Sequence, residues 1–265
     1  MGVMVRFLCY EKYFVHFHNF ENYVFSLIYH NIRRIFVKKL VIIPAFNEQA
    51  SIKKTVQDIK DNAPDFDYIV INDCSTDDTL KVCEENGINV LKLPVNLGIG
   101  GAVQSGYLYA YRNGYDVAVQ FDGDGQHSAK YLGEMAKTLI DNEADMVIGS
   151  RFITNEGFQS SFMRRVGIKH FNVLIKMLTG ATVTDPTSGM RMVNRDIIKL
   201  FSLDYPKDYP EPESVVQIIS MGKKVVDVPV IMNERTEGVS SISPGKSIYY
   251  MIKVTIAMII ARIRK

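Results

Sequence analysis

Val119-Gln-Phe-Asp-Gly-Asp-Gly-Gln-His127 is the stretch around which the chain is organised, because it ends an apolar run with two carboxylates and an amide at two-residue spacing. Asp122, Asp124 and Gln126 supply oxygen ligands, which hard divalent cations such as Mg²⁺ and Mn²⁺ prefer. The intervening glycines remove side chains that would block the close approach of a diphosphate. An acidic surface turn is the alternative interpretation of this spacing, so the neighbouring segments decide between the two.

Apolar runs recur on both sides of this stretch and alternate with segments of helical pattern, such as residues 48–62 and 77–86. This alternation predicts βαβ units. The runs are almost continuously apolar, which predicts a mostly parallel sheet that is buried on both faces. We therefore expect an α/β fold in which the strands lie at residues 40–43, 68–71, 90–93, 117–121 and 146–148.

Polar segments follow three of the expected strands, at residues 44–48, 72–77 and 122–126. In a mostly parallel sheet, ligands bind at the carboxyl ends of the strands, near the point where the strand order reverses. The three segments are therefore expected to meet at one edge of the sheet. Together they favour metal-assisted handling of a phosphorylated donor over an acidic surface turn.

A glycine-rich segment, Asn96-Leu-Gly-Ile-Gly-Gly101, precedes another expected helix. Its spacing matches neither a Walker loop nor the GxGxxG fingerprint, which argues against P-loop and dinucleotide-binding proteins. Ala102, Gly106 and Ala110 form a stripe of small residues at four-residue spacing, and we expect this stripe to let the helix approach the sheet closely. Contact between phosphate and the N–H groups of the segment is the alternative.

The composition describes a chain that is able to bury a large core. It has 265 residues, 47% of them hydrophobic, and a net charge of only +2 with dispersed basic residues. One large α/β domain fits this length, and the absence of a clustered basic patch argues against nucleic acid as a partner. The three cysteines lack metal-binding spacing, which favours reduced thiols in a cytosolic compartment.

Residues 1–36 differ from the rest of the chain because they are rich in aromatic side chains, as in Phe14-Val-His-Phe-His-Asn-Phe20. They contain neither a run long enough to span a bilayer nor the pattern of a signal peptide. We expect an aromatic packing or membrane-surface extension, with metal ligation by His16 and His18 as the alternative. A further hypothesis is that the functional chain begins near Val37, which detection of peptides from residues 1–30 in the native protein would exclude.

Six motifs in order resemble family 2 glycosyltransferases, and in particular the branch that transfers sugars to dolichyl and polyprenyl phosphates. The resemblance covers residues 38–245. It implies a GT-A fold, a nucleotide-sugar donor, Mg²⁺ or Mn²⁺, and inversion at the anomeric carbon. The motifs are Pro44-Ala-Phe-Asn-Glu48, Asn72-Asp-Cys-Ser-Thr-Asp77, Asn96-Leu-Gly98, Phe121-Asp-Gly-Asp-Gly-Gln-His127, Gly149-Ser-Arg151 and Asp185-Pro-Thr-Ser-Gly-Met-Arg191.

The resemblance also implies roles for residues of the donor site. Asp122, Asp124 and Gln126 would hold the metal against the diphosphate, and the nucleoside would be lined by Pro44, Phe46, Glu48 and Asp73. The chain departs from the family pattern at three positions, which leaves the identity of the bound base open. Phe46 stands where Tyr is usual, Asn72 replaces the first Asp of an acidic pair, and Cys74 stands where Gly is common.

Arginines are expected on the acceptor side, because a guanidinium pairs well with phosphate oxygens. In the resembling lipid-phosphate transferases, arginines of corresponding segments grip the acceptor phosphate, and surface ion pairing is the alternative. The residues concerned are Arg151, Arg191 and Arg235, together with Arg164 and Arg165.

An acidic base is needed only if the acceptor is a hydroxyl, because a phosphate monoester is already anionic at neutral pH. Glu211 and Glu213 of Tyr209-Pro-Glu-Pro-Glu213 fall where saccharide-directed members of the family place such a base, on a loop stiffened by proline. The alternative is that they are acids at the N-terminus of a helix that continues through the apolar run at 215–219.

The C-terminal residues 246–265 are rich in Ile, Met and Tyr and carry Lys246, Lys253 and Arg264 on one helical face. This pattern favours an amphipathic helix at a membrane interface. Packing on the same domain or in a homo-oligomer is the alternative. The expected organisation is thus an extension (1–36), a catalytic domain (37–245) and this helix.

The combined prediction is an inverting, metal-dependent transferase that moves a hexose from a nucleotide sugar to polyprenyl phosphate. It would act on the inner face of a membrane, as a peripheral protein or docked on a separate membrane protein. Transfer to a hydroxyl of a cell-surface glycan is the second hypothesis. A non-catalytic scaffold that binds nucleotide sugar is the third, and the intact acidic stretch argues against it.

Overall fold

The computed structural model describes residues 37–154, 156–157, 162–208, 210–233 and 244–264. Within them, seven strands form one sheet in the order β3-β2-β1-β4-β6-β5-β7. All neighbours are parallel except β6, which is antiparallel to β4 and β5. The strands are β1 (Lys39–Ala45), β2 (Asp67–Asn72), β3 (Val90–Lys92), β4 (Val117–Gln120), β5 (Met146–Ser150), β6 (Arg191–Asn194) and β7 (Val225–Pro229).

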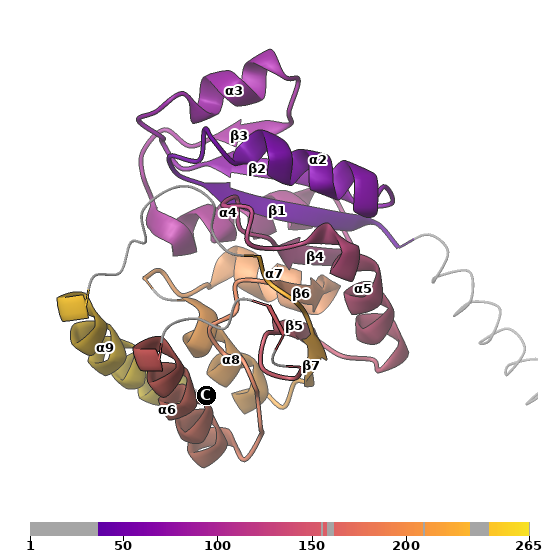
Figure 1. The fold of residues 1–265 in the computed structure, drawn as a ribbon. Helices are drawn as coiled ribbons and strands as arrows, with labels where there is room; N and C mark the ends of the chain where they lie inside the picture. Colours follow the sequence, from indigo (N-terminus) through magenta and orange to yellow (C-terminus); the bar gives the residue numbers. More distant parts are fainter. Residues whose placement is uncertain (1–36, 155, 158–161, 209, 234–243, 265) are drawn as a thin grey trace, which may run out of the picture. The chain divides into compact units, whose positions relative to one another are not determined.

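Helices cover both faces of this sheet (Figure 1). In chain order the helices of the described residues are α2 (Ile52–Asn62), α3 (Thr79–Glu85), α4 (Gly98–Arg112), the 3₁₀ turn η1 (Ala129–Tyr131), α5 (Leu132–Asp141), α6 (Phe162–Thr179), α7 (Arg195–Leu203), α8 (Pro210–Ser220) and α9 (Pro244–Ile263). The first five strands and the first two helices lie where the sequence pattern predicts them. The α/β fold with a mostly parallel sheet is therefore confirmed.

Two strands were not predicted from the sequence, β6 and β7. β6 begins with Arg191 and ends with Asn194, and β7 carries Asp227. Neither segment therefore contains the apolar run by which the other strands were identified. β6 lies between β4 and β5, where it is the antiparallel member of the sheet.

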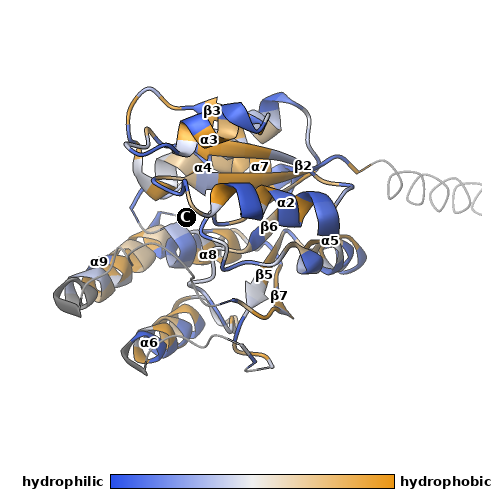
Figure 2. Ribbon diagram, turned by 45° about the horizontal axis from the view of Figure 1, so that its top comes forward, coloured by the Kyte–Doolittle hydropathy of each residue, from blue (hydrophilic) through white to orange (hydrophobic). Residues whose placement is uncertain are grey.

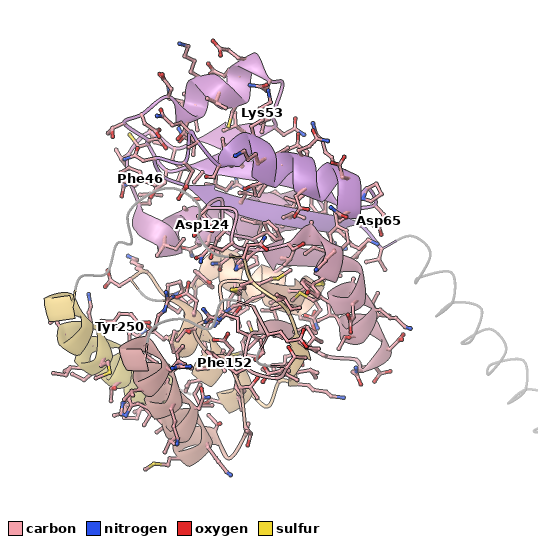
Figure 3. All side chains as sticks on the ribbon, in the orientation of Figure 1. Phe46, Lys53, Asp65, Asp124, Phe152 and Tyr250 are labelled. Carbon is pink, nitrogen blue, oxygen red and sulfur yellow. The ribbon has the colours of Figure 1, made fainter. Side chains whose placement is uncertain are left out.

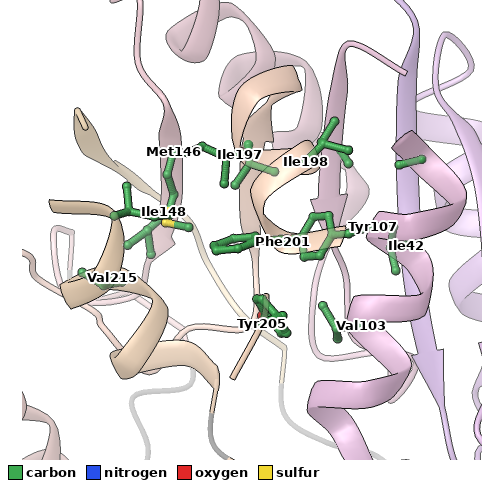
Figure 4. Packing of buried hydrophobic residues seen from close by; sticks show 14 of the residues in the cluster. Ile42, Val103, Tyr107, Met146, Ile148, Ile197, Ile198, Phe201, Tyr205 and Val215 are labelled. Atoms are coloured by element: carbon green, nitrogen blue, oxygen red, sulfur yellow. The ribbon is translucent and has the colours of Figure 1, made fainter. Parts of the chain in front are cut away.

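A hydrophobic core lies between one face of the sheet and helices α4, α7 and α8 (Figure 4), and it extends to α6 and α9. Leu40 and Ile42 of β1 point into it, because alternate residues of a strand face the same side. Its centre is an aromatic cluster in which the ring of Phe201 lies 5.2 Å from that of Tyr107 and 4.8 Å from that of Tyr205. This cluster joins α4, α7 and the segment before α8.

Helix α4 lies very close to the sheet and to the segment before α8. A Cβ atom on Gly106 would lie 2.2 Å from Cγ2 of Ile42, and one on Gly100 would lie 2.2 Å from the carbonyl oxygen of Lys207. The N–H of Gly100 donates to the same Lys207 oxygen at 3.1 Å. The small-residue stripe therefore serves packing, as the sequence analysis expected.

We expect Gly106→Ala to destabilise the protein although alanine is the better helix former. Overpacking a filled core costs about 1–3 kcal/mol, whereas replacing Gly by Ala in a helix gains only about 0.5–1 kcal/mol. Thermal unfolding should show a melting temperature lowered by about 2–6 °C. The control is Gly133→Ala in α5, where no atom lies within 4 Å of the added Cβ. That variant should melt slightly higher, and equal effects of the two changes would contradict the packing argument.

Helices α6, α8 and α9 pack together beside the sheet (Figures 1 and 2). Val254 and Met258 of α9 are fully buried, which shows that one side of α9 is part of the hydrophobic core. Among the described residues, no helix combines the length and the apolar character needed to cross a membrane.

Candidate active site

The residues predicted for the donor site lie at the carboxyl ends of β1, β2 and β4. The strand order reverses between β1 and β4, since β2 and β3 lie on one side of β1 and β4 on the other. The loops that leave β1 and β4 therefore diverge and leave room for a ligand. Figure 3 shows Phe46 and Asp124 on this side of the molecule and Asp65 at the opposite edge.

The loop after β1 is joined to the loop after β2 through Asn47. Its side-chain oxygen accepts hydrogen bonds from the backbone N–H groups of Thr76 at 2.8 Å and Asp77 at 3.4 Å. The N–H of Glu48 donates to the hydroxyl of Thr79 at 2.8 Å. These bonds fix the backbone on both sides of Glu48, and the side chain of Phe46 remains 47% exposed. Pro44, by contrast, is buried at the end of β1.

Asp73 is a buried residue that holds the segment before α4. Its carboxylate accepts a hydrogen bond from the N–H of Leu97 at 2.7 Å, and its carbonyl accepts one from the side chain of Asn96 at 3.0 Å. The neighbouring Cys74 has φ +56°. Glycine adopts this conformation without strain, whereas a residue with a side chain does so at a cost.

The buried His127 contacts both the backbone and the carboxylate of Asp122. The backbone N–H of Asp122 donates to Nδ1 of His127 at 3.1 Å, which places the imidazole proton on Nε2, 3.7 Å from the Asp122 carboxylate. The His127 side chain is 2% exposed and that of Asp122 is 36% exposed. The histidine therefore orients a carboxylate that solvent still reaches. His127 belongs to the acidic motif, but its sequence position alone did not predict this role.

Asp124 and Gln126 lie in a tight turn next to Asp122. The carboxylate of Asp124 accepts a hydrogen bond from the N–H of Gln126 at 3.1 Å, and the carbonyl of Gln126 accepts one from Asn233 at 2.9 Å. All three predicted ligands are partly exposed. This set fits a hard ion, because Mg²⁺ is commonly bound by one or two carboxylates, water and substrate phosphates. Across the described ranges, no cluster of three His, Cys, Asp or Glu side chains forms a complete metal site.

Gly189 lies directly against the Asp122 carboxylate. A Cβ atom at this position would be 2.5 Å from Oδ2 of Asp122. Any larger residue would therefore displace the carboxylate. The glycine belongs to the Asp185–Arg191 motif, so the sequence contained a signal, but only the tertiary structure shows what the glycine contacts.

Arg151 and Asp185 form a buried salt bridge. Nε and Nη2 of the guanidinium donate to the two carboxylate oxygens at 2.7 and 2.8 Å, and Nη2 also donates to Thr187 at 3.1 Å. The side chain of Arg151 is 5% exposed and that of Asp185 is fully buried. This bidentate geometry holds the 185–189 turn. It does not fit the prediction that Arg151 grips an acceptor phosphate through its paired donors.

The prediction that Arg191 binds the acceptor phosphate also does not fit the structure. Its side chain is 1% exposed, and the guanidinium donates to the carbonyls of Ser188 at 2.7 Å, Pro186 at 2.5 Å and Glu211, and to the hydroxyl of Ser214 at 2.9 Å. Arg191 therefore joins the turn that contacts Asp122 to the first turn of α8. It positions the site from within the protein.

We expect Arg191→Met to destabilise the protein by roughly 3 kcal/mol or more, because it leaves three carbonyl acceptors without a partner at about 1–3 kcal/mol each. Urea unfolding measures this loss. Arg195→Met is the matched control, since Arg195 is 57% exposed and pairs with Asp116 at the surface. Its loss should stay below about 1 kcal/mol. Unchanged stability of Arg191→Met with weakened acceptor binding would restore the original assignment.

The remaining predicted arginines have different positions. Arg164 and Arg165 are exposed residues in the first turn of α6. The pKa of Arg164 is lowered by desolvation and by the charge of Arg151, and it is partly restored by groups that include Asp185 and Asp122. Arg164 therefore lies within electrostatic range of Arg151, Asp185 and Asp122. Arg235 lies outside the described residues.

Glu211 and Glu213 lie on the same helix but have different charged neighbours. Both lie in the first turn of α8, as the helix N-terminal alternative expected, and this turn is helical from Pro210 although proline was expected to stiffen a loop. Burial raises the pKa of Glu211, whose neighbours are Arg191, Asp122 and Gln120. Burial also raises the pKa of Glu213, but its charged neighbours are Arg264, Asp204 and Asp208. Only Glu211 has Asp122 among these neighbours.

The profile of one protein family, described as glycosyl transferase family 2, matches residues 40–201. The chain belongs to this family. The matched region includes every strand from β1 to β6 and the whole of the acidic stretch after β4. The protein is therefore a glycosyltransferase, as its motifs predicted.

Two relatives carry names that concern polyprenyl acceptors. The undecaprenyl-phosphate mannosyltransferase of Micrococcus luteus is 30% identical over 218 residues, which cover 79% of this chain and 89% of the relative. The polyprenol monophosphomannose synthase of Mycolicibacterium smegmatis is 29% identical over 227 residues, which cover 82% of this chain and 85% of the relative. This glycosyltransferase thus matches most of their length.

Solved structures share the fold of this glycosyltransferase. The glucosyl-3-phosphoglycerate synthase of Mycobacterium tuberculosis, in a complex with Mn²⁺ and UDP-glucose, aligns with a TM-score of 0.65 at 20% identity. The alignment covers 88% of this chain and 81% of the synthase. At this identity the likeness shows the common GT-A architecture alone.

Proposed function

We propose that this glycosyltransferase transfers a hexose from a nucleoside-diphosphate sugar to a polyprenyl phosphate, with inversion at the anomeric carbon, at a membrane surface. The proposed nucleotide-sugar donor is supported by the position of Asp122 and Asp124. These are two accessible carboxylates at the point where the strand order reverses. The acceptor half is supported by the relatives named for transfer to undecaprenyl phosphate and polyprenol.

Asp122, Asp124 and Gln126 would hold Mg²⁺ or Mn²⁺ against the diphosphate. A divalent ion there would neutralise the charge that develops on the leaving diphosphate. The exposed ring of Phe46 offers a face for stacking of the base, and the fixed loops around Glu48 and Asp73 line the same edge of the sheet. Pro44 contributes buried backbone next to Gly123.

A phosphate acceptor fits the charges around the site. Its oxygen is already anionic, so a single in-line displacement needs no general base. Arg164 offers a positive charge from α6 on the side of Asp122 and Arg151. Arg151 and Arg191 contribute by holding the surrounding turns, and contact of Arg165 or Arg235 with the acceptor stays a prediction.

A hydroxyl acceptor on a glycan is the second candidate, and the position of Glu211 is the observation that favours it. Glu211 has Asp122 as a neighbour and its pKa is raised by burial, as expected for a base that works near neutral pH. An assay that measures whether the transferred sugar enters organic solvent separates the two candidates.

Exposed apolar side chains on α6 and α9 support action at a membrane surface. On α9 they lie on the side opposite the buried Val254 and Met258, and α6 adds Val166, Val173 and Met177. Neither helix contains an acidic residue. Apolar side chains flanked by basic ones are typical of a helix at an anionic lipid interface. The exposed residues of α9 are Tyr249, Ile252, Ile256, Ile259, Ile260 and Ile263.

The basic residues of α9 were expected to face a membrane, but two of them lie near acids of the protein itself. Lys253 pairs with Asp208 at 2.7 Å, and Arg264 has Glu213 as a charged neighbour. This face of the helix is therefore directed partly toward acids of the protein itself. The exposed cations of α6, which are Arg165, Lys169 and Lys176, are the better candidates for contact with anionic lipid.

The proposed reaction is tested with radiolabelled UDP- and GDP-sugars, Mn²⁺ and undecaprenyl or dolichyl phosphate, by counting label that enters organic solvent. We expect one sugar to be extracted in a metal-dependent way. Asp124→Asn should reduce the rate on the order of 10²–10³-fold, since it removes a charge at the metal. The control is Asp65→Asn, which loses only a surface pair with Lys39 at the opposite edge.

The same assay distinguishes the other hypotheses. Donor turnover without extractable label would favour a hydroxyl acceptor, and Glu211→Gln should then abolish transfer to that acceptor. Neither donor turnover nor transfer would favour a nucleotide-sugar-binding scaffold. Full activity of Asp124→Asn would refute the metal assignment.

Membrane binding is tested by sedimentation with vesicles of phosphatidylglycerol. We expect the double variant Ile252→Glu/Ile256→Glu to bind at least about tenfold more weakly, because burying each isoleucine is worth roughly 1.5–3 kcal/mol. Leu203→Glu is the control, since Leu203 is 73% exposed at the end of α7. Equal binding of both variants would remove α9 from the membrane contact.

A further inference from the structure

Gln120 is a fully buried polar residue at the last position of β4, two residues before Asp122. Its side-chain amide contacts groups from three parts of the chain. The amide nitrogen donates to Oδ1 of Asp122 at 3.4 Å, and it lies on the side of Glu211. The amide oxygen accepts a hydrogen bond from the hydroxyl of Tyr205 at 3.3 Å. Gln120 therefore lies between two carboxylates and a phenol.

The chemistry of these partners allows one orientation of the amide. Ionised carboxylates only accept hydrogen bonds, so the NH₂ group has to face Asp122 and Glu211. The oxygen then faces Tyr205, whose phenol is protonated at neutral pH and donates to it. The amide therefore has one partner at its nitrogen and one at its oxygen, as expected for a buried polar side chain.

Each partner of Gln120 is itself fixed by tertiary packing. The ring of Tyr205 lies 4.8 Å from that of Phe201 and 5.5 Å from that of Tyr107 in the aromatic core. The backbone carbonyl of Glu211 accepts a hydrogen bond from the buried Arg191. The amide is thus held between the core on one side and the first turn of α8 on the other.

We propose that Gln120 is the positioning residue that sets the Asp122 and Glu211 carboxylates relative to each other, and that Tyr205 fixes the orientation of its amide. Gln120 limits rotation of the Asp122 carboxylate, which would face the metal. This inference rests on the proposed metal role of Asp122.

The test measures binding of Mn²⁺ alone to the full chain, by electron paramagnetic resonance of free Mn²⁺. Gln120→Met keeps the length of the side chain and removes both donors. We expect it to weaken Mn²⁺ binding by about tenfold or more, the usual effect of removing a group that orients a metal ligand. Tyr205→Phe keeps the aromatic packing and removes only the hydroxyl, and it should cause a smaller loss in the same direction.

Gln57→Met is the matched control, because Gln57 also donates to a carboxylate, that of Asp61 at 2.8 Å, on the exposed face of α2. It should leave Mn²⁺ affinity unchanged. Circular dichroism and thermal melting establish that each variant is folded. If Gln120→Met does not fold, Tyr205→Phe decides, since a weaker affinity supports the proposal and an unchanged one overturns it.

The failure of this inference is distinguishable from the failure of the proposed function. If the wild-type chain binds Mn²⁺ and a folded Gln120→Met variant binds it equally well, Gln120 is not a positioning residue and the metal site stands. If the wild-type chain itself does not bind Mn²⁺, the metal role of Asp122 fails and the inference fails with it.

Discussion

The reversal of strand order at β1 is the constraint on which the site depends. β1 pairs in parallel with β2 on one side and with β4 on the other, so the chain leaves these strands in diverging directions. Backbone at this edge has no further strand to pair with, and side chains from both loops face the same space. The loops after β1 and β2 and the acidic stretch after β4 therefore lie at the same edge of the sheet although they are far apart in the sequence.

Buried polar groups hold this edge in place. Arg151 pairs with Asp185, Arg191 joins the following turn to α8, and Asp73 holds the segment before α4. Buried charges are costly unless every donor and acceptor has a partner. These residues therefore tie their surroundings to single positions. Their effect is to place Gly189 against Asp122 and Glu211 near Gln120, where small displacements would move the Asp122 carboxylate.

Periodicity and motif order predicted the first half of the fold well. Apolar runs between helical segments identified β1 to β5, because strands of a sheet that is covered on both faces consist mostly of apolar residues. The same argument failed for β6 and β7, which are short and contain polar residues. Their strand character comes from pairing with β4 and β5, which is a property of the assembled sheet.

The sequence by itself determined the α/β class, the family and the position of the acidic stretch after β4, because these depend on local patterns and on residues that follow strands directly. Tertiary structure decided the roles of the arginines, since burial and hydrogen-bond partners depend on which distant segments surround a side chain. Arginine is a residue type that often binds phosphate, but the guanidinium of Arg191 is buried and donates to backbone carbonyls. The same holds for Glu211 and Glu213, which are two residues apart in sequence but face different charges because a helix directs them to different sides.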